Sequence, residues 1–443
     1  MRKDRSSSIL NRSGKRLLSQ PKYSSRMEVI SVLDENMLID RTLTSRFNDI
    51  SNAFPVVLIT GPRQVGKTTL LEQCMSKTVT YVTLDSLTDR ALAQEDPTLF
   101  LQRYPPPVVI DEIQYAPGLF SAIKLAVDKR RQTGLFWLTG SQKFHLMRGV
   151  SESLAGRVAV LDLLGLSLAE IHGQAADSPP FLPNADYLKS SAMHGRPSSL
   201  MQIFERIWTG SFPAVVLNPK MDRELFYKSY LQTYVERDVR DLARVGDEGA
   251  FVRFLRAAAA RTGQLLNIAE MARDVGVDAK TARSWLSILE TSGLIYLLQP
   301  YHSNLSKRLV KAPKLYFLDT GLCCHLTRWT SAAVLEAGAM SGALLETFVI
   351  AEILKSYWHN AKCPVLYFYR DKDQKEVDLL IEQDGQFYPV EIKKTASPNV
   401  GMIKSFKTME KRGMTIGPGA VVCLVDHCVP ITRGVDAIPV GYI

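Results

Sequence analysis

The chain has 443 residues, a hydrophobic content of 46% and a formal net charge of +9. This length predicts about three domains, and the excess of positive charge favours anionic partners. No apolar run approaches the roughly 20 residues that cross a bilayer, so we expect no membrane insertion. The six cysteines form no C-x-x-C pair. We interpret them as free thiols of a reducing compartment and expect a cytoplasmic protein.

Residues 1–38 form a basic head that we expect to be disordered. Its first 26 residues are rich in serine, lack helical periodicity and carry a single acid, Asp4, among many lysines and arginines. A translation start at Met27 would also explain them. A transit peptide has a similar composition and ranks lower.

Residues 39–172 alternate between short apolar segments and helix-like stretches. The segments "FPVVLIT", "TYVTLD", "PPVVIDE", "LFWLTGS" and "VAVLDL" are rich in β-branched residues, and each precedes a turn or a helical pattern. Such segments predict a buried parallel sheet with helices on both faces. The fold class is therefore α/β.

A phosphate-binding loop follows the first of these strands. In "LITGPRQVGKTTLLEQC", the spacing Gly61-x-x-x-x-Gly66-Lys67-Thr68 is that of a P-loop. Backbone N–H groups and the start of the helix would attract phosphate. Lys67 would reach the β- and γ-phosphates of ATP, and Thr68 would bind Mg²⁺. The residues that we expect to contact the nucleotide are Gly61, Pro62, Arg63, Gln64, Val65, Gly66, Lys67, Thr68 and Thr69.

Acidic and polar residues end two later strands. In "PPVVIDEIQYAP", Asp111 would hold Mg²⁺ through water and Glu112 would polarise the attacking water. In "FWLTGSQ", Ser141 or Gln142 could orient that water, or Ser141 could only cap a helix. Arg157 precedes the fifth strand and could act on a neighbouring subunit's γ-phosphate, which would imply a homo-oligomer. A surface role for Arg157 is the alternative.

The middle of the chain has three parts. Residues 173–199 are rich in proline and predict a linker or insertion, and residues 200–262 predict a helical lid. Residues 263–330 have the pattern of a helix-turn-helix followed by a strand, as in a winged helix. Lys280, Arg283 and Ser284 are the candidates for DNA contact on its second helix, and the basic residues Lys307, Arg308, Lys311 and Lys314 follow it. A lid or an interaction module is the alternative.

Residues 331–443 contain a predicted hairpin, "EVDLLIEQDGQFYPVEIKKT". With Asp384-Gly385 as the turn, Asp378 lies opposite Glu391. Directly opposed carboxylates repel one another, so a cation, a proton or water must compensate. The pattern is similar to the PD-(D/E)xK nuclease signature, in which Asp378 and Glu391 would hold Mg²⁺ or Mn²⁺ beside Lys393.

Those nucleases often add an acid from a preceding helix, and Glu346 in "GALLETFVIAEILKSYW" fits that place. The position before Asp378 holds Val377 rather than proline, which departs from the signature. A charged face with a plain Glu376–Lys393 ion pair is the alternative interpretation.

The order of phosphate loop, Asp-Glu strand, polar-tipped strand and arginine resembles an AAA+ ATPase core. More narrowly, "VVLITGPRQVGKTTLL", "DEIQYAPGLFSAIK", "LTGSQ" and "SLAGRVAVLDLLGLSLAEI" resemble a prokaryotic AAA-type ATPase family with a C-terminal domain of unknown function, DUF4143. The resemblance runs from about Ile39 to Lys394 and includes "TYVERDVRDL" and "KLYFLDTGL". It implies the fold more firmly than the function.

These patterns predict an ATP-hydrolysing protein that acts on DNA through a winged-helix segment and a nuclease-like tail. Two other hypotheses stay open. One is a nucleotide-dependent switch that acts through a protein partner, with the tail as an inactive docking fold. The other is a DNA-binding regulator in which ATP only sets the conformation.

Overall fold

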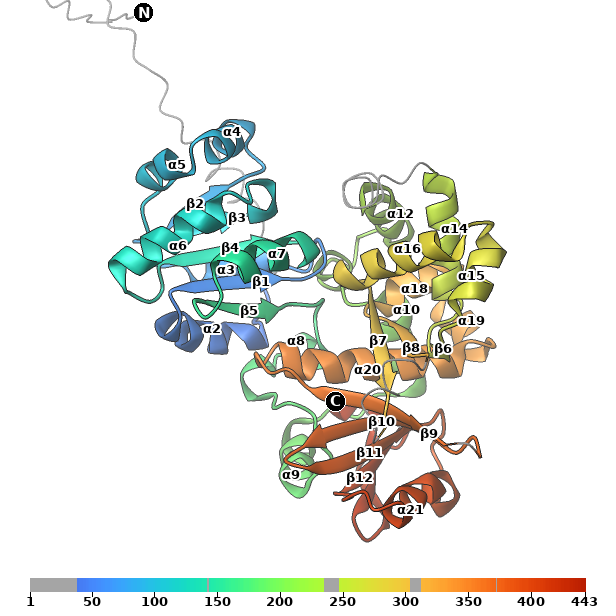
Figure 1. Ribbon diagram of the computed structural model, residues 1–443. Coiled ribbons are helices and arrows are strands. Elements are labelled where there is room, and N and C mark those ends of the chain that lie inside the picture. The colour runs from blue at the N-terminus through green and yellow to red at the C-terminus, as the bar shows by residue number, and fades with distance from the viewer. Residues whose placement is uncertain (1–37, 142, 235–246, 303–311, 372) are drawn as a thin grey trace, which may run out of the picture. The chain divides into compact units, whose positions relative to one another are not determined.

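The five apolar segments form a fully parallel sheet, as their pattern predicts (Figure 1). The computed structural model describes residues 38–141, 143–234, 247–302, 312–371 and 373–443. The prediction of a disordered head therefore lies outside the described residues, apart from Leu38. The strand order is β2-β3-β4-β1-β5. The strands are β1 (Val56–Thr60), β2 (Thr80–Thr83), β3 (Val108–Asp111), β4 (Phe136–Gly140) and β5 (Val158–Asp162).

Helices cover both faces of this sheet because successive side chains of a strand point to opposite sides. Val57 and Ile59 of β1 share one core with α2 and α3, whereas Val56 and Leu58 share another with α4 to α7. The helices are α2 (Thr42–Ala53), α3 (Lys67–Cys74), α4 (Leu87–Glu95), α5 (Pro97–Arg103), α6 (Leu119–Arg130) and α7 (Lys143–Ser153), with a short 3-10 turn, η2 (Ile113–Tyr115). The near-continuous apolar strands thus indicate a sheet buried on both sides.

The segment 173–199 contains more regular structure than its prolines suggest. After α8 (Leu168–Ile171) and η3 (Ala175–Asp177), it includes a ten-residue helix, α9 (Ala185–His194). Asn184 caps α9 by accepting the N–H of Tyr187 at 2.8 Å, and Phe181 and Tyr187 are buried. Pro179, Pro180 and Pro183 precede this cap and Pro197 follows α9, so none of them interrupts its helical hydrogen bonds.

Helices follow, as the pattern of residues 200–262 predicts. They are α10 (Leu200–Thr209), α11 (Pro213–Val216), α12 (Arg223–Tyr234) and α14 (Glu248–Ala259). A cluster of aromatic rings from α12 and the loop before α11 packs around Phe212, whose ring centroid lies 4.7 Å from that of Tyr230.

The predicted helix-turn-helix elements are present. Helix α15 (Ile268–Val275) ends at Gly276, whose left-handed φ of 78° suits glycine. Asp278 caps α16 (Ala279–Thr291), and β7 (Ile295–Pro300) follows. The remaining elements here are β6 (Gln264–Leu265), β8 (Lys314–Phe317), α18 (Thr320–Leu326) and α19 (Ala332–Ala337).

A nine-stranded mixed sheet runs through the second half of the chain in the order β13-β14-β12-β11-β10-β9-β7-β8-β6. Because β7 pairs with β9, strands on both sides of residue 330 belong to one sheet. Its other strands are β9 (Val365–Arg370), β10 (Glu376–Gln383), β11 (Gln386–Ile392), β12 (Gly419–Cys423), β13 (Val429–Thr432) and β14 (Val435–Pro439). The accompanying helices are α20 (Ser341–Trp358), η5 (Val400–Ile403), α21 (Lys404–Lys411) and η6 (Val440–Tyr442).

The hairpin of β10 and β11 has the predicted register. Leu379 pairs with Val390 and Gln383 with Gln386. Asp384 and Gly385 form the turn with φ values of 52° and 76°, as a tight two-residue hairpin turn requires. In the part of the chain that the structure describes, no helix is long and apolar enough to cross a membrane.

Candidate functional site

The phosphate loop joins the end of β1 to the start of α3. Gly61 has a φ of 145° and Gly66 a φ of 93°, and Gly66 immediately precedes the first helical residue, Lys67. The Lys67 ammonium donates to the carbonyl oxygens of Gly61 at 3.0 Å and Pro62 at 2.7 Å. The loop therefore combines a cation with the positive end of a helix, which suits a bound polyphosphate.

Asp111 ends β3 beside this loop. Its carboxylate lies 3.2 and 3.3 Å from the Thr68 hydroxyl and accepts the Tyr81 hydroxyl at 2.9 Å. The Thr139 hydroxyl also donates to it. Hydroxyl and carboxylate oxygens are the ligands that Mg²⁺ prefers, so Thr68 and Asp111 fit that ion. Thr68 and Asp111, which we predicted from the sequence as the residues that hold Mg²⁺, are therefore in contact.

Glu112 has a left-handed φ of 57° and lies next to the same polar edge. Its carboxylate accepts the side-chain amide of Gln114 and lies 3.9 Å from the Arg63 guanidinium. Its backbone N–H donates to Thr139 at 3.2 Å. Thr139 thus contacts both acidic residues, whereas we predicted that Ser141 or Gln142 would orient the water near them. Gln142 lies outside the described residues. Ser141 is buried, and its hydroxyl has no hydrogen-bond partner among the described residues. The two residues are two apart in "LTGS", which is the signal that could have identified Thr139.

Arg157 lies where the parallel strands begin, at the opposite end of the strands from the phosphate loop. It precedes β5, which runs parallel to β1 with Val158 beside Val56, whereas the phosphate loop follows the last residue of β1. Arg157 pairs with Asp128 of α6 at 2.7 Å. Arg157 could therefore contact only a γ-phosphate bound to another subunit, and not one bound to the phosphate loop of its own chain.

A buried network of charged residues lies next to the phosphate loop. We did not predict it from the sequence. Arg41 donates to the carbonyl oxygens of Val65 and Leu164, both at 2.8 Å, and pairs with Glu170 at 3.1 Å. His359 lies 3.1 Å from Glu170 through Nδ1, and its Nε2 accepts the N–H of Leu164 at 3.2 Å. Its proton is therefore on Nδ1, facing the carboxylate. These residues are scattered along the chain, so no local pattern links them.

Glu170 is ionised in this network. Burial alone would raise its pKa, but the charge of Arg41 and the contact with His359 outweigh burial and hold the pKa well below its usual value. The backbone N–H groups of Thr42 and Ser167 also donate to the carboxylate, each at 2.9 Å. A buried carboxylate with this many donors is stable as an anion.

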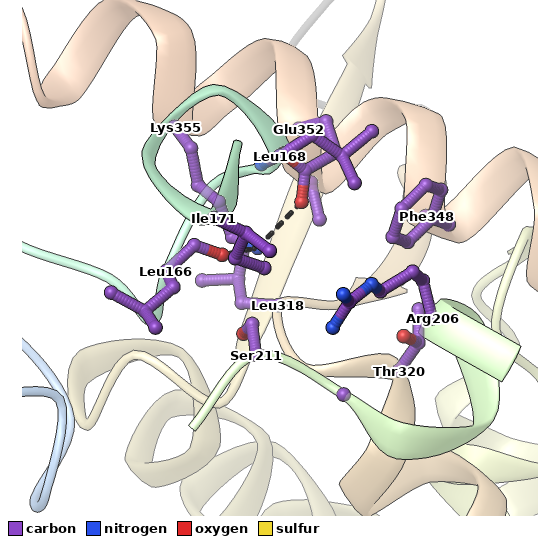
Figure 2. A pocket seen from close by; sticks show the side chains of 12 residues that line it. Leu166, Leu168, Ile171, Arg206, Ser211, Leu318, Thr320, Phe348, Glu352 and Lys355 are labelled. Carbon is purple, nitrogen blue, oxygen red and sulfur yellow. Dashed lines mark hydrogen bonds and ion pairs between the residues drawn. The ribbon is translucent and has the colours of Figure 1, made fainter. Parts of the chain in front are cut away.

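Helix α20 anchors the segment that follows β5. Glu352 accepts the N–H of Leu168 at 2.8 Å, and Lys355 donates to the carbonyl of Leu166 at 3.0 Å. Glu352 and Lys355 also pair at 2.7 Å. Figure 2 shows these side chains around a cavity of about 10 Å³, which holds about one water molecule. Together with His359, which directly follows α20, these two residues bind this segment.

A cluster of charges lies at the base of the β10–β11 hairpin. Asp378 and Glu391 are both buried, and the Lys393 ammonium lies 2.9 Å from the first and 2.7 Å from the second. Asp378 also accepts the backbone N–H of Ile392 at 2.8 Å. The three residues predicted from the nuclease-like pattern are therefore in contact, and the ammonium lies between the two acids.

Glu346 of α20 joins this cluster, as predicted. It accepts the Tyr316 hydroxyl at 2.6 Å and pairs with Lys314 at 3.2 Å. Lys314 also pairs with Glu376. Lys314 is one of the basic residues that we named after the helix-turn-helix as candidates for DNA contact, but it is only 5% exposed. It is the first residue of β8 and faces these acids, so it is not accessible to phosphate. Polar residues at alternate positions of "KLYF" are the signal that was overlooked.

The cluster has an excess of negative charge. Burial and the charge of Asp378 raise the pKa of Glu391 to about 9, and the same two causes raise the pKa of Glu346. Oxygen ligands and this charge suit a hard divalent cation. Among the described residues, however, no three acid, histidine or cysteine side chains converge on one point. A cation would have to displace the Lys393 ammonium from between Asp378 and Glu391.

The second helix of the helix-turn-helix exposes the predicted side chains. Lys280, Arg283 and Ser284 of α16 are all exposed, whereas Trp285 is buried against Phe254 with a centroid distance of 5.6 Å. The basic residues Lys307, Arg308 and Lys311 lie outside the described part of the chain.

Comparisons with known proteins divide the chain into three parts. Residues 53–172 match an AAA domain family, residues 201–333 a domain of unknown function, DUF8612, and residues 341–443 another, DUF4143. Among solved structures, the Walker-type ATPase PABY2304 of Pyrococcus abyssi is 14% identical with a TM-score of 0.40, and the match covers 66% of this chain and 97% of that one. Likeness at this level carries no functional argument.

Two curated relatives match over most of the chain. They are the uncharacterized proteins Rv2008c of Mycobacterium tuberculosis and Mb2031c of Mycobacterium bovis, each 30% identical over 411 residues. Each match covers 92% of this chain and 85% of the relative. The chain, with its AAA domain and its C-terminal DUF4143 domain, belongs to the family of these two mycobacterial proteins.

Proposed function

We propose that this protein binds ATP with Mg²⁺ at the phosphate loop and hydrolyses it. One observation carries the proposal: where β1 and β3 end, the Thr68 hydroxyl contacts the Asp111 carboxylate, and the Lys67 ammonium bonds to the carbonyls of a loop bounded by two glycines in left-handed conformations. This arrangement supplies a cation for phosphate and oxygen ligands for a metal.

The residues where β1 and β3 end would have different roles in hydrolysis. Lys67 would neutralise charge that develops on the γ-phosphate, and Glu112 would accept the proton of the attacking water. The buried Ser141 hydroxyl is available to that water as a hydrogen-bond partner. Bound Mg²⁺ would neutralise phosphate charge. Arg157 would serve a neighbouring subunit, so we propose a homo-oligomer as the form that hydrolyses ATP fastest.

Phosphate release and ATP binding test this proposal separately. We expect Lys67→Ala to lose ATP binding, measured with a fluorescent ATP analogue and Mg²⁺. We expect Glu112→Gln to bind ATP but not release phosphate. Lys407→Ala removes an exposed lysine of α21 and should behave as wild type. Equal hydrolysis by wild type and Glu112→Gln would contradict the assignment of the base.

We further propose that the cluster of Glu346, Asp378, Glu391 and Lys393 cleaves phosphodiesters in DNA with Mg²⁺ or Mn²⁺. The metal would lower the pKa of a water and stabilise charge on phosphate. Asp378 and Glu391 would hold it, and Lys393 would orient the water. The contacts among these residues support the proposal. Plasmid nicking in Mn²⁺ that disappears in Asp378→Ala is the expected result.

The exposed Lys280 and Arg283 support DNA contact by a winged helix that spans residues 263–330. We propose the other boundaries as well: an ATPase core at 39–172, a linker at 173–199, a lid at 200–262 and a nuclease-like domain at 331–443. The pairing of β7 with β9 supports a close connection between the last two of these proposed domains.

A second function is favoured by the position of Lys393, whose ammonium already lies between the two acids. In this alternative the tail is an inactive fold that docks a protein partner, and ATP controls docking. The absence of nicking by wild type, together with no retention on heparin at moderate salt, would favour this switch over the nuclease.

A further inference from the structure

Strand β8 contributes two side chains to the acid cluster, although it lies before the DUF4143 match at residues 341–443. Lys314 pairs with Glu346 at 3.2 Å and also with Glu376. The Tyr316 hydroxyl donates to the same oxygen of Glu346 at 2.6 Å. Because these two residues are two apart on a strand, their side chains lie on one face, and that face is covered by α20.

The Lys314 ammonium is buried, and two acids, Glu346 and Glu376, pair with it. A lysine that only filled space would not have two acidic partners. Lys314 thus links Glu346 to Glu376, because two neighbouring carboxylates repel one another unless a cation lies beside them.

We propose that Lys314 and Tyr316 are positioning residues that fix the Glu346 carboxylate beside the cation-binding site proposed for Asp378 and Glu391. This inference rests on the proposed metal-dependent cleavage of phosphodiesters. Both matched segments would then contribute to the site. The acids come from residues 341–443, and the residues that orient one of them come from residues 201–333.

A purely structural role makes a different prediction. Removing one partner of a buried ion pair typically destabilises a protein, so thermal stability is measured for every variant, and Lys314→Arg keeps the charge. If Lys314 only supports the fold, Mn²⁺ affinity will follow thermal stability in every variant. If it positions Glu346, Mn²⁺ affinity will fall even in variants that melt at the wild-type temperature, and a positively charged replacement will restore it.

The experiment is calorimetric titration of the nucleotide-free full-length chain with Mn²⁺. Wild type is compared with Lys314→Met, Lys314→Arg, Tyr316→Phe and Asp378→Ala, and Lys407→Met is the control that loses one exposed charge. We expect Lys314→Met to bind Mn²⁺ about 10- to 100-fold more weakly, as is typical of residues that orient metal ligands. Tyr316→Phe should lose about tenfold, because it removes one hydrogen bond to a charged group. Lys314→Arg should recover most of the affinity.

The outcomes separate this inference from the function on which it rests. Binding that is lost in Asp378→Ala but unchanged in Lys314→Met and Tyr316→Phe would overturn the positioning role and leave the metal site intact. Equal Mn²⁺ binding by wild type and Asp378→Ala would overturn the metal site and the inference together. If Lys314→Met does not fold, Tyr316→Phe decides the question, because it removes only one oxygen atom.

Discussion

Replacing Glu170 with glutamine should destabilise the ATPase core by about 3 kcal/mol. The change keeps the shape of the side chain but leaves the buried Arg41 without a counter-charge. Removing one partner of a buried ion pair typically costs about 3 to 5 kcal/mol. The lower value applies because Arg41 keeps its bonds to the carbonyls of Val65 and Leu164, so its charge stays partly solvated by backbone dipoles.

Urea unfolding followed by tryptophan fluorescence would measure this loss. Trp137 of β4 lies against Phe47 of α2 with a centroid distance of 4.8 Å, so its emission reports on the same core. Glu410→Gln, an exposed position of α21, is the matched control and should unfold at the wild-type midpoint. A midpoint for Glu170→Gln equal to that of Glu410→Gln would refute the reasoning.

The difference should also depend on pH with a definite sign. The folded pKa of Glu170 is lower than its unfolded value, so its ionisation stabilises the folded state fully above the unfolded pKa of about 4.3. That stabilisation is lost progressively as the pH falls below about 4. Wild type and Glu170→Gln should therefore converge in acid and differ most near neutrality.

Three further variants test other parts of the structure. Gly61→Ala should abolish ATP binding in a fluorescence titration, because its φ is 145° and a Cβ there would overlap the carbonyl oxygen of Leu163; wild-type binding would contradict this geometry. Thr139→Val should slow phosphate release about tenfold with ATP binding retained, because it removes a hydrogen bond to a charged group; an unchanged rate would exclude a role for that hydroxyl. Lys280→Ala with Arg283→Ala should weaken duplex DNA binding equally for all sequences and lower the slope of log affinity against log salt by about 2, whereas an unchanged slope would place the DNA elsewhere.

Local patterns predict much of this fold. Alternation within β10 and β11, together with the Asp384-Gly385 turn, is sufficient for the register that the structure has. The reason is that a shift of one residue would move every core side chain to the solvent face. The glycine spacing of the phosphate loop likewise places Lys67 and Thr68 correctly. These features depend on residues that are close in sequence.

Contacts between distant segments could not be predicted in the same way. Lys314 appears in a basic stretch, and its pattern favours a solvated face until the sheet places it against Glu346. Arg41 and His359 are separated by most of the chain, and neither has a neighbour that signals the other. Net charge and periodicity describe a segment, whereas these contacts depend on how segments pack.

Helix α20 has a consequence for how the protein can be divided. It carries Glu346, Glu352 and Lys355, and His359 directly follows its last residue. A fragment that begins at residue 341 would lose the contacts of these side chains with β8 and with the β5–α8 connection, and it would expose apolar side chains such as Phe348, which packs beside Leu166 and Leu168. We therefore expect such a fragment to be insoluble when it is produced alone. Exchange of C-terminal halves between relatives should succeed only when the β5–α8 connection and β8 are transferred with α20.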